Sequence, residues 1–368
     1  MAKLNLVIAD LDERYTRGLS DYISANHSTA FLVSCFTNPD SLIKYLGQQP
    51  RADVILISPD FYDTTVGYSN IKLKIMLSTG FLSQEYPDFQ VLSKYSTGEK
   101  LLGEVVHLYS KLNPSELRLS PYSKNAELIG IYSTAGGAGK TTIAAALSME
   151  CAELGMHSFY LSIESIQSTG MFFNINGKRN LSYIYYYLKE KSKNLPFLMD
   201  GIKSTDADNG VQYFNPPESP LEYEELNSDE VEQLIQGIKG IGCYDFVFID
   251  MSNTFDIKNY KIMELCDRIV FVTLQGPIAM HKDKILHNEL IKLSDTDRDS
   301  VSDKFITVIN RYKNADYESF EYSKDATPAI LRIPEYSRVL INEGGRLVIN
   351  DEGFRKAISQ LMKEISGK

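Results

Sequence analysis

The stretch Ile129–Leu147 reads I-G-I-Y-S-T-A-G-G-A-G-K-T-T-I-A-A-A-L and decides the fold of this 368-residue chain. Its first residues are apolar, β-branched or aromatic, which favours a buried strand, and its last residues are rich in alanine, which favours a helix. Gly136, Gly137 and Gly139 lie between them and let successive backbone N–H groups turn inward. Because the following helix adds its positive N-terminal end, this strand, loop and helix predict a cradle for phosphate groups.

The polar residues of this loop fit the chemistry of a nucleoside triphosphate. In such a loop Lys140 reaches the β- and γ-phosphates as a point charge, and the Thr141 hydroxyl ligates the Mg²⁺ that accompanies the nucleotide. Thr134 stands where the usual spelling G-x-x-x-x-G-K-[ST] has its first glycine, and the alternative is a Gly-rich turn with an incidental lysine. The expected nucleotide contacts are Ala135, Gly136, Gly137, Ala138, Gly139, Lys140, Thr141 and Thr142.

Length and composition describe an ordinary globular chain. Its 368 residues suggest about two domains, and 43% hydrophobic residues are enough for packed cores. A net charge of −10 argues against a dedicated nucleic-acid binder, which usually presents a basic face. The four cysteines lack metal-ligand spacing, which favours buried thiols.

The N-terminus reads M-A-K-L-N-L-V-I-A-D and is expected to form a first strand rather than a secretion signal. No apolar run approaches the ~20 residues that span a bilayer. These two observations favour a cytoplasmic location.

The first 112 residues alternate short apolar segments with amphipathic ones. This alternation predicts βα units and a small doubly wound, parallel α/β sheet of the flavodoxin-like type. The expected strands lie at 4–9, 31–36, 54–57, 73–77 and 89–92, with helical periodicity at 15–23, 40–45 and 101–112.

Polar residues follow the strands of this predicted sheet. Asp10 and Asp12 come after the first strand, Ser78 after the fourth and Lys94 after the fifth. In this respect the segment resembles a response-regulator receiver domain, which implies an Mg²⁺-binding acidic pair and a phosphoacceptor aspartate after the third strand. Ser58 stands at that last position and cannot form the acyl phosphate. We therefore expect a receiver-shaped domain that serves protein contacts, while the alternative for the two acids is that they cap the next helix.

Residues 113–127 contain two prolines and several serines without an apolar period, which marks a linker. The expected organisation is a receiver-like domain at 1–112, a linker at 113–127 and a P-loop NTPase domain with a doubly wound, mostly parallel sheet at 128–368. The expected strands of the second domain lie at 128–133, 158–163, 211–214, 246–249, 269–273 and 305–309, with a helix at 229–238.

Residues at strand ends complete the expected nucleotide site. Asp250 follows a buried strand, where a P-loop protein places the carboxylate that holds Mg²⁺ through water. Asn310 and Arg311 end another strand, and an asparagine amide there can pair with adenine or belong to a simple turn.

The stretch 331–348 predicts a strand, a proline, a helix and a Gly-Gly turn. Within it, Pro334 and Glu335 either close over the nucleotide base or merely end the strand. Both residues are therefore candidate nucleotide contacts.

The order of these motifs resembles the MinD/ParA family of deviant Walker ATPases, which implies ATP or ADP and Mg²⁺ as cofactors. The resemblance further implies a homodimer through the ATPase domain, with two nucleotides between the subunits. Joined to a receiver-like domain without its phosphoacceptor, the architecture resembles the TadZ/CpaE group, which localises Flp (tight adherence) pilus machinery. The implied partners are pilus or secretion assembly proteins or a polar marker, at the cell pole or the inner face of the membrane.

Two departures from the family pattern weaken the expected catalysis. Ala135 occupies the position of the family's signature lysine, which reaches the phosphates of the partner subunit. Ser162 and Glu164 occupy the family's D-x-D positions, so the acid that would orient the attacking water is Glu164 or is absent. With Lys140 and Glu164 as the remaining catalytic candidates, we expect tight binding of Mg-ATP and slow or negligible hydrolysis.

Other assignments remain open from the sequence. A MinD-like membrane switch needs a detachable amphipathic helix at the C-terminus, whereas the alternative is a last helix docked on the sheet. A ParA-like DNA partition ATPase needs salt-sensitive DNA binding, which the acidic total disfavours. The iron-protein branch needs cluster-ligating cysteines, and no suitable pair is evident. A scaffold that keeps the nucleotide as a structural ligand is the last alternative.

Overall fold

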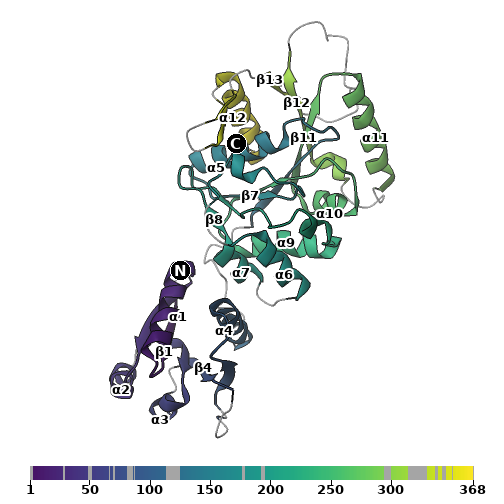
Figure 1. Cartoon of the computed structure of the whole chain (residues 1–368). Coiled ribbons are helices and arrows are strands. Elements are labelled where there is room, and N and C mark those ends of the chain that lie inside the picture. Colours follow the sequence, from purple (N-terminus) through teal and green to yellow (C-terminus); the bar gives the residue numbers. More distant parts are fainter. Residues whose placement is uncertain are drawn as a thin grey trace. The chain divides into compact units, whose positions relative to one another are not determined.

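The computed structural model describes residues 3–27, 30–48, 52–65, 67–68, 71–80, 86, 88–112, 125–175, 179–191, 195–293, 300–313, 330–335, 339–341, 345–349 and 351–367. The chain forms two compact units, residues 1–123 with 191–201 and residues 124–190 with 202–368. Each unit has helices packed around a central sheet (Figure 1).

The first unit contains a five-stranded parallel sheet with the order β2-β1-β3-β4-β5. This order is the flavodoxin-like one, so the predicted doubly wound sheet is confirmed. The central strand β3 is buried along its whole length, as expected of a parallel strand covered on both faces. The elements are β1 (Leu4–Ala9), α1 (Glu13–Asn26), β2 (Phe31–Phe36), α2 (Pro39–Gly47), β3 (Ala52–Ile57), α3 (Tyr62–Thr65), β4 (Ile71–Ser78), β5 (Gln90–Ser93) and α4 (Gly98–Leu112).

Helix α7 (Leu195–Ile202) brings residues from the middle of the chain into the first unit, as far as Gly201. Phe197 stacks on His27 with ring centroids 4.7 Å apart and meets Phe31 edge-on at 5.9 Å. The first unit is therefore completed by a segment distant in sequence, which its own strand pattern does not reveal.

The acids after β1 have different partners. Asp12 caps helix α1, because its carboxylate accepts a hydrogen bond from the Tyr15 N–H at 3.1 Å. Asp10 is buried and lies 2.7 Å from Lys94 Nζ, which also lies 4.7 Å from the centroid of the Tyr15 ring. The capping alternative thus holds for Asp12, while Asp10 forms an ion pair.

The second unit contains an eight-stranded sheet with the order β13-β12-β11-β6-β10-β7-β9-β8. Its strand pairs are parallel except for β8 and β9, which confirms a mostly parallel sheet. The strands are β6 (Glu127–Tyr132), β7 (Ser158–Ser162), β8 (Ser204–Thr205), β9 (Gln212–Tyr213), β10 (Phe246–Asp250), β11 (Arg268–Leu274), β12 (Phe305–Tyr312) and β13 (Ile330–Pro334). The helices are α5 (Lys140–Glu153), α6 (Leu181–Lys189), α8 (Leu221–Glu224), α9 (Ser228–Ile241), α10 (Ile257–Leu265), α11 (Pro277–Leu293) and α12 (Glu352–Ser366).

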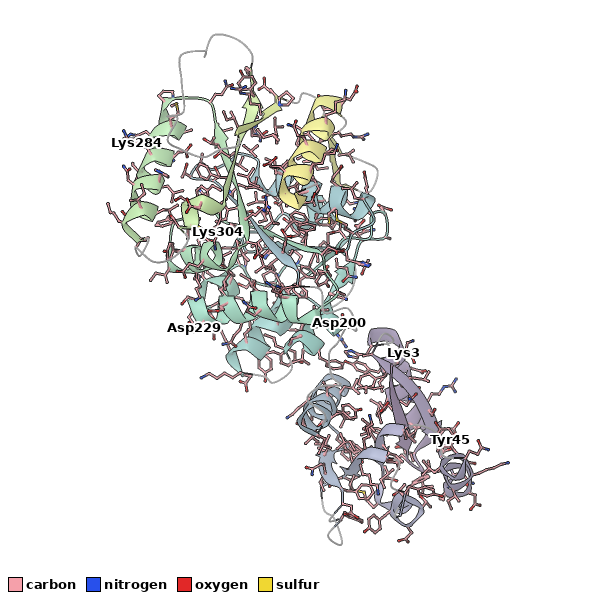
Figure 2. All side chains as sticks on the ribbon, turned by 180° about the vertical axis from the view of Figure 1, so that it is seen from behind. Lys3, Tyr45, Asp200, Asp229, Lys284 and Lys304 are labelled. Atoms are coloured by element: carbon pink, nitrogen blue, oxygen red, sulfur yellow. The ribbon has the colours of Figure 1, made fainter. Side chains whose placement is uncertain are left out.

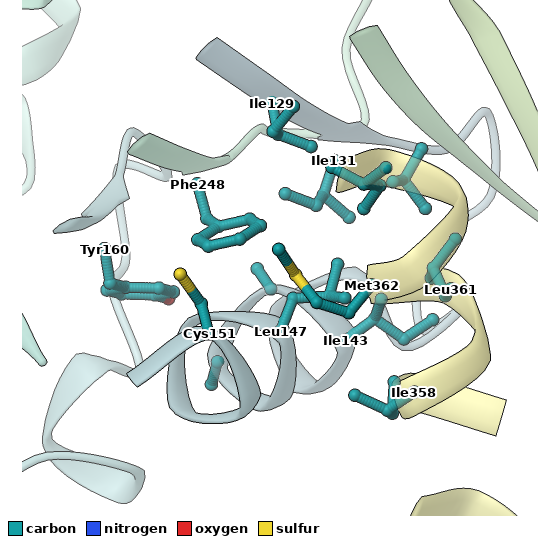
Figure 3. Close-up of a cluster of buried hydrophobic side chains, with 14 of the residues drawn as sticks. Ile129, Ile131, Ile143, Leu147, Cys151, Tyr160, Phe248, Ile358, Leu361 and Met362 are labelled. Carbon is teal, nitrogen blue, oxygen red and sulfur yellow. The ribbon is translucent and has the colours of Figure 1, made fainter. Parts of the chain in front are cut away.

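Helices cover both faces of this sheet. Helices α5 and α12 pack against each other, and α9 packs against α10 on the opposite side (Figure 1). Charged side chains such as Asp229 and Lys284 point outward from the unit (Figure 2). Between sheet and helices lies an apolar core in which Ile131, Leu147 and Phe248 are fully buried (Figure 3).

The C-terminal helix α12 belongs to this core. Its apolar face is buried against α5 and the sheet (Figure 3). The buried side chains of that face are Phe354, Ala357, Ile358, Leu361, Met362 and Ile365. The structure therefore shows the docked helix of the two sequence alternatives. No helix in the described part of the chain is long and apolar enough to cross a membrane.

One predicted element is wrong. Within the described part of the helix expected between Pro334 and the Gly-Gly turn, the chain forms strand β14 (Val339–Ile341), which pairs antiparallel with β15 (Leu347–Ile349) after the turn. Val339–Ile341 is a short run with β-branched ends, which favours extended backbone. Gly345 adopts a φ of +75°, which allows the chain to reverse before β15. The parallel strand expected at 211–214 is also shorter, since β9 covers Gln212–Tyr213.

Candidate functional site

The glycine-rich loop runs from the end of β6 to the start of α5 at Lys140. Gly137 and Gly139 have φ angles of +69° and +95°, a region that residues with a Cβ rarely adopt. Gly139 is also the N-cap residue of α5 and offers no side chain to the first N–H groups of the helix. Those N–H groups therefore face the loop, which is the arrangement that binds an anion.

Thr134 anchors the start of this loop. Its hydroxyl donates to Asp283 Oδ1 at 2.6 Å, and the Thr273 hydroxyl donates to Asp283 Oδ2 at 2.5 Å. Asp283 is buried on helix α11, so its carboxylate ties the loop to both α11 and the end of β11. A threonine can thus replace the usual glycine here because its hydroxyl has a fixed ionic acceptor.

Lys140 lies in the site with an acid beside it. Its Nζ is 3.8 Å from Glu164 Oε1, and its side chain is 6% exposed. Burial raises the pKa of Glu164, while the nearby Lys140 charge and a hydrogen bond from Thr141 partly oppose that rise. The two catalytic candidates of the sequence are therefore neighbours.

Asp250 ends strand β10 and is 0% exposed. Its Oδ2 accepts a hydrogen bond from the Tyr160 hydroxyl at 3.0 Å, while its Oδ1 accepts none from the residues that the structure describes. Burial raises the pKa of Asp250 to about 7 and the Glu164 carboxylate adds to the rise, while the neighbouring Thr141 hydroxyl, the hydrogen bond from Tyr160 and the Lys140 charge oppose it. A buried carboxylate oxygen without a donor is suited to receive a cation.

The residues present fit Mg²⁺ held together with a nucleotide. Thr141 and Asp250 supply a hydroxyl and a carboxylate, which are hard oxygen ligands. Across the described residues, no group of three or more His, Cys, Asp and Glu side chains forms a separate metal site. Few protein ligands are typical of Mg²⁺, which keeps water and phosphate oxygens in its coordination shell.

Asn310 and Arg311 end strand β12 beside the loop. The Asn310 amide nitrogen donates to the Ala138 carbonyl at 2.7 Å, and its oxygen accepts from the Arg311 N–H at 2.9 Å. Asn310 is 0% exposed, so its side chain braces the phosphate loop from within the fold. Arg311 is exposed and adopts a φ of +54°, where the register of β12 and β13 shifts. Such a backbone conformation in a residue other than glycine is concentrated at functional sites.

Pro334 and Glu335 lie at the end of β13, next to β12. Pro334 pairs with Tyr312 in the sheet, and the Glu335 N–H donates to the Tyr312 carbonyl at 3.2 Å. The Glu335 carboxylate lies 2.9 Å from Lys313 Nζ. Both candidate base contacts are thus placed at the same edge of the sheet as Asn310.

Two contributors to the site escaped the sequence analysis. Tyr160 precedes the end of β7 by two residues and reads as an ordinary buried aromatic. Asp283 could have been noticed in the sequence, because its spacing places it on the same helix face as the buried Ala279, Leu286 and Leu290 of α11. An aspartate on an apolar helix face requires a buried partner.

Comparisons with known proteins give the fold. No family profile matches the sequence, and no curated protein matches it. A ParA family ATPase from Chlorobium tepidum TLS has a TM-score of 0.52 and 17% identity, and the match covers 64% of this chain and 98% of that one.

Two further solved structures are similar at lower scores. The septum site-determining protein MinD from Pyrococcus horikoshii OT3, complexed with Mg-ADP, has a TM-score of 0.49 and 18% identity over 65% of this chain and 96% of its own. A plasmid partition protein from Borrelia burgdorferi B31, bound to AMPPNP, has a TM-score of 0.47 and 15% identity over 67% of this chain and 100% of its own. On the strength of the first match, the second unit has the α/β fold seen in a ParA family ATPase.

Proposed function

We propose that this chain is a member of the MinD/ParA family of deviant Walker ATPases and that it binds Mg-ATP. The observation that carries this proposal is the convergence of Lys140, Thr141 and Asp250 around the glycine loop. The loop offers N–H groups and a lysine to phosphate, and Asp250, which lies near Thr141 and Lys140, has an oxygen without a donor among the described residues. The ParA-like fold supports the assignment.

The bound Mg²⁺ would neutralise charge on the β- and γ-phosphates. Lys140 would exchange its contact with Glu164 for the phosphates, since a phosphate group carries more charge than one carboxylate. The Asp250 carboxylate would hold the cation through a bridging water molecule. Asn310 would keep the loop in shape through its bond to the Ala138 carbonyl.

Hydrolysis is proposed to be slow. Ala135 has no charged side chain to offer a partner subunit. The Glu164 carboxylate lies 3.8 Å from Lys140 Nζ, so it interacts with that lysine and does not serve only to orient water. Loss of a transition-state cation removes charge stabilisation, which supplies most of the catalysis in phosphoryl transfer. The nucleotide would therefore act mainly as a ligand.

We further propose that ATP holds two copies together through the ATPase domain. The exposed large apolar side chains of the second unit include Ile166 at 81%, Leu221 at 68% and Ile257 at 78%. Their segments are linked, because Glu224 accepts a hydrogen bond from Ser165 and lies 3.5 Å from Lys258 Nζ. Exposed apolar side chains gathered on one surface are typical of a protein interface.

The more particular proposal is a TadZ/CpaE-like protein that localises Flp pilus or secretion machinery at the cell pole. The support is the combination of a P-loop unit with a flavodoxin-like unit that has Ser58 at the phosphoacceptor position. In that first unit Asp10 already neutralises Lys94, the cation that a receiver would use on a phosphoryl group. Incubation with acetyl phosphate and Mg²⁺ should leave the intact mass unchanged, and stoichiometric phosphorylation would refute a role limited to protein contacts.

Calorimetric titration with ATP in the presence of Mg²⁺ tests the proposed function. The wild-type chain should bind one ATP per copy, and Lys140→Ala should lose at least about tenfold in affinity because it removes a charged phosphate contact. The matched control is Lys284→Ala, which removes an exposed lysine on α11 and should bind as the wild type does. Equal binding by all three proteins, or none by the wild type, would contradict the proposal.

A further inference from the structure

Tyr160 joins the cation-binding carboxylate to the apolar core. It lies on β7, is 1% exposed, and donates its hydroxyl hydrogen to Asp250 Oδ2 at 3.0 Å. A buried phenol hydroxyl needs an acceptor, and here that acceptor is the carboxylate of the candidate Mg²⁺ site. The contact therefore serves both side chains.

Packing fixes the Tyr160 ring in one place. Phe173 lies 5.0 Å from it between ring centroids, and Phe173 in turn stacks on Tyr213 at 5.0 Å. Figure 3 shows Tyr160 beside Cys151 and Phe248 within the core over α5. A ring enclosed on several sides holds its hydroxyl at a constant position, so the direction of the hydrogen bond to Asp250 is constant as well.

Because of this fixed donor, the two carboxylate oxygens of Asp250 differ in their hydrogen bonding. Oδ2 is taken by Tyr160, and Oδ1 accepts no hydrogen bond from the described residues. Rotation of the carboxylate would break the bond to Tyr160, so Oδ1 keeps its direction. A tyrosine hydroxyl carries its proton across the physiological pH range, so the Tyr160 hydroxyl stays a donor.

We propose that Tyr160 is a positioning residue that holds the Asp250 carboxylate for the divalent cation accompanying the nucleotide. This inference rests on the proposed function. Hydrogen-bond partners of metal-binding carboxylates commonly change metal affinity by about 10- to 100-fold when they are removed. Tyr160 acts through Asp250 and touches neither nucleotide nor metal, so its loss should weaken the cation without weakening the phosphate contacts.

The test measures ATP affinity with EDTA and with Mg²⁺ for four proteins: wild type, Tyr160→Phe, Asp250→Asn and the double variant. Tyr160→Phe removes one oxygen and keeps the ring, and circular dichroism with thermal unfolding checks its fold. We expect an unchanged affinity in EDTA, and a gain on adding Mg²⁺ that is about tenfold smaller than in the wild type. Asp250→Asn should lose the gain, and the double variant should lose no more than Asp250→Asn alone.

The matched control is Tyr244→Phe, because Tyr244 is equally buried but donates its hydroxyl to Gln212. It should keep the full gain from Mg²⁺. The inference is overturned if Tyr160→Phe lowers affinity equally in EDTA and in Mg²⁺, keeps the full gain, or adds its loss to that of Asp250→Asn. A wild-type chain that binds no ATP under either condition overturns the proposed function itself, and the inference with it.

Discussion

Replacing Asp250 with asparagine should stabilise the second unit in the absence of divalent cations while removing the benefit of Mg²⁺ for nucleotide binding. Asp250 is 0% exposed, and its Oδ1 accepts no hydrogen bond from the described residues. Ionising such a group inside the protein costs free energy that asparagine does not incur. An asparagine amide at this position keeps an oxygen that can accept the Tyr160 hydrogen bond.

The pKa of Asp250 gives the size and sign of this effect. Folding raises it from an ordinary value of 3.8 to about 7. Between these values the folded protein binds more protons than the unfolded one, so its contribution to stability is present at low pH and is lost as pH rises to about 7. The interval corresponds to about 4 kcal/mol in total, of which roughly 2–3 kcal/mol falls between pH 5 and pH 8. Asparagine does not titrate.

Urea unfolding in EDTA at pH 5, 6, 7 and 8 measures this difference. The free energy of unfolding of Asp250→Asn minus that of the wild type should grow by roughly 2–3 kcal/mol from pH 5 to pH 8. Asp229→Asn is the matched control, since Asp229 is exposed, and its difference from the wild type should stay constant. A constant difference for Asp250→Asn, or one that shrinks with rising pH, would refute the reasoning about this carboxylate.

Three further substitutions test the roles of individual side chains. Asp283→Ala removes the acceptor of Thr134 and Thr273, so urea unfolding should show a loss of roughly 2–4 kcal/mol, and an unchanged stability would disprove the anchoring role. Leu361→Ala, at a fully buried position of α12, should cost about 2–5 kcal/mol in the same assay, whereas a loss below about 1 kcal/mol would mean that α12 is not docked in solution. Ala135→Lys should raise steady-state ATP turnover at least about tenfold if two subunits share their sites, and no increase would argue against that geometry.

The parts of the fold that the sequence predicts well are those with continuous apolar patterns. Strand β3 is buried at every position, and in the loop before α5 Gly137 and Gly139 stand where φ is positive. Such local signals do not depend on distant residues. Strand β14 is wrongly predicted as part of a helix, because three apolar residues before a glycine turn carry no period that separates the two structures.

The sequence predicts those site residues whose polar side chains lie at or just after the end of a buried strand. Lys140, Thr141 and Asp250 lie together because the parallel strands β6 and β10 are neighbours in the sheet. Tyr160 and Asp283 are not predictable as site residues, since their roles depend on contacts with residues 90 and 149 positions away along the chain. Only the strand order and helix packing bring those pairs together.

Size-exclusion chromatography with light-scattering detection, which gives the molar mass of the eluting protein, tests the central claim most directly when it is run with and without Mg-ATP. The wild-type chain should change from the mass of one copy to that of two when Mg-ATP is added, and Lys140→Ala should keep the mass of one copy under both conditions. Ile257→Asp should bind ATP yet stay at one copy, because it places a charge on the proposed interface. A wild-type mass that does not respond to Mg-ATP would contradict an account in which the nucleotide holds two subunits together.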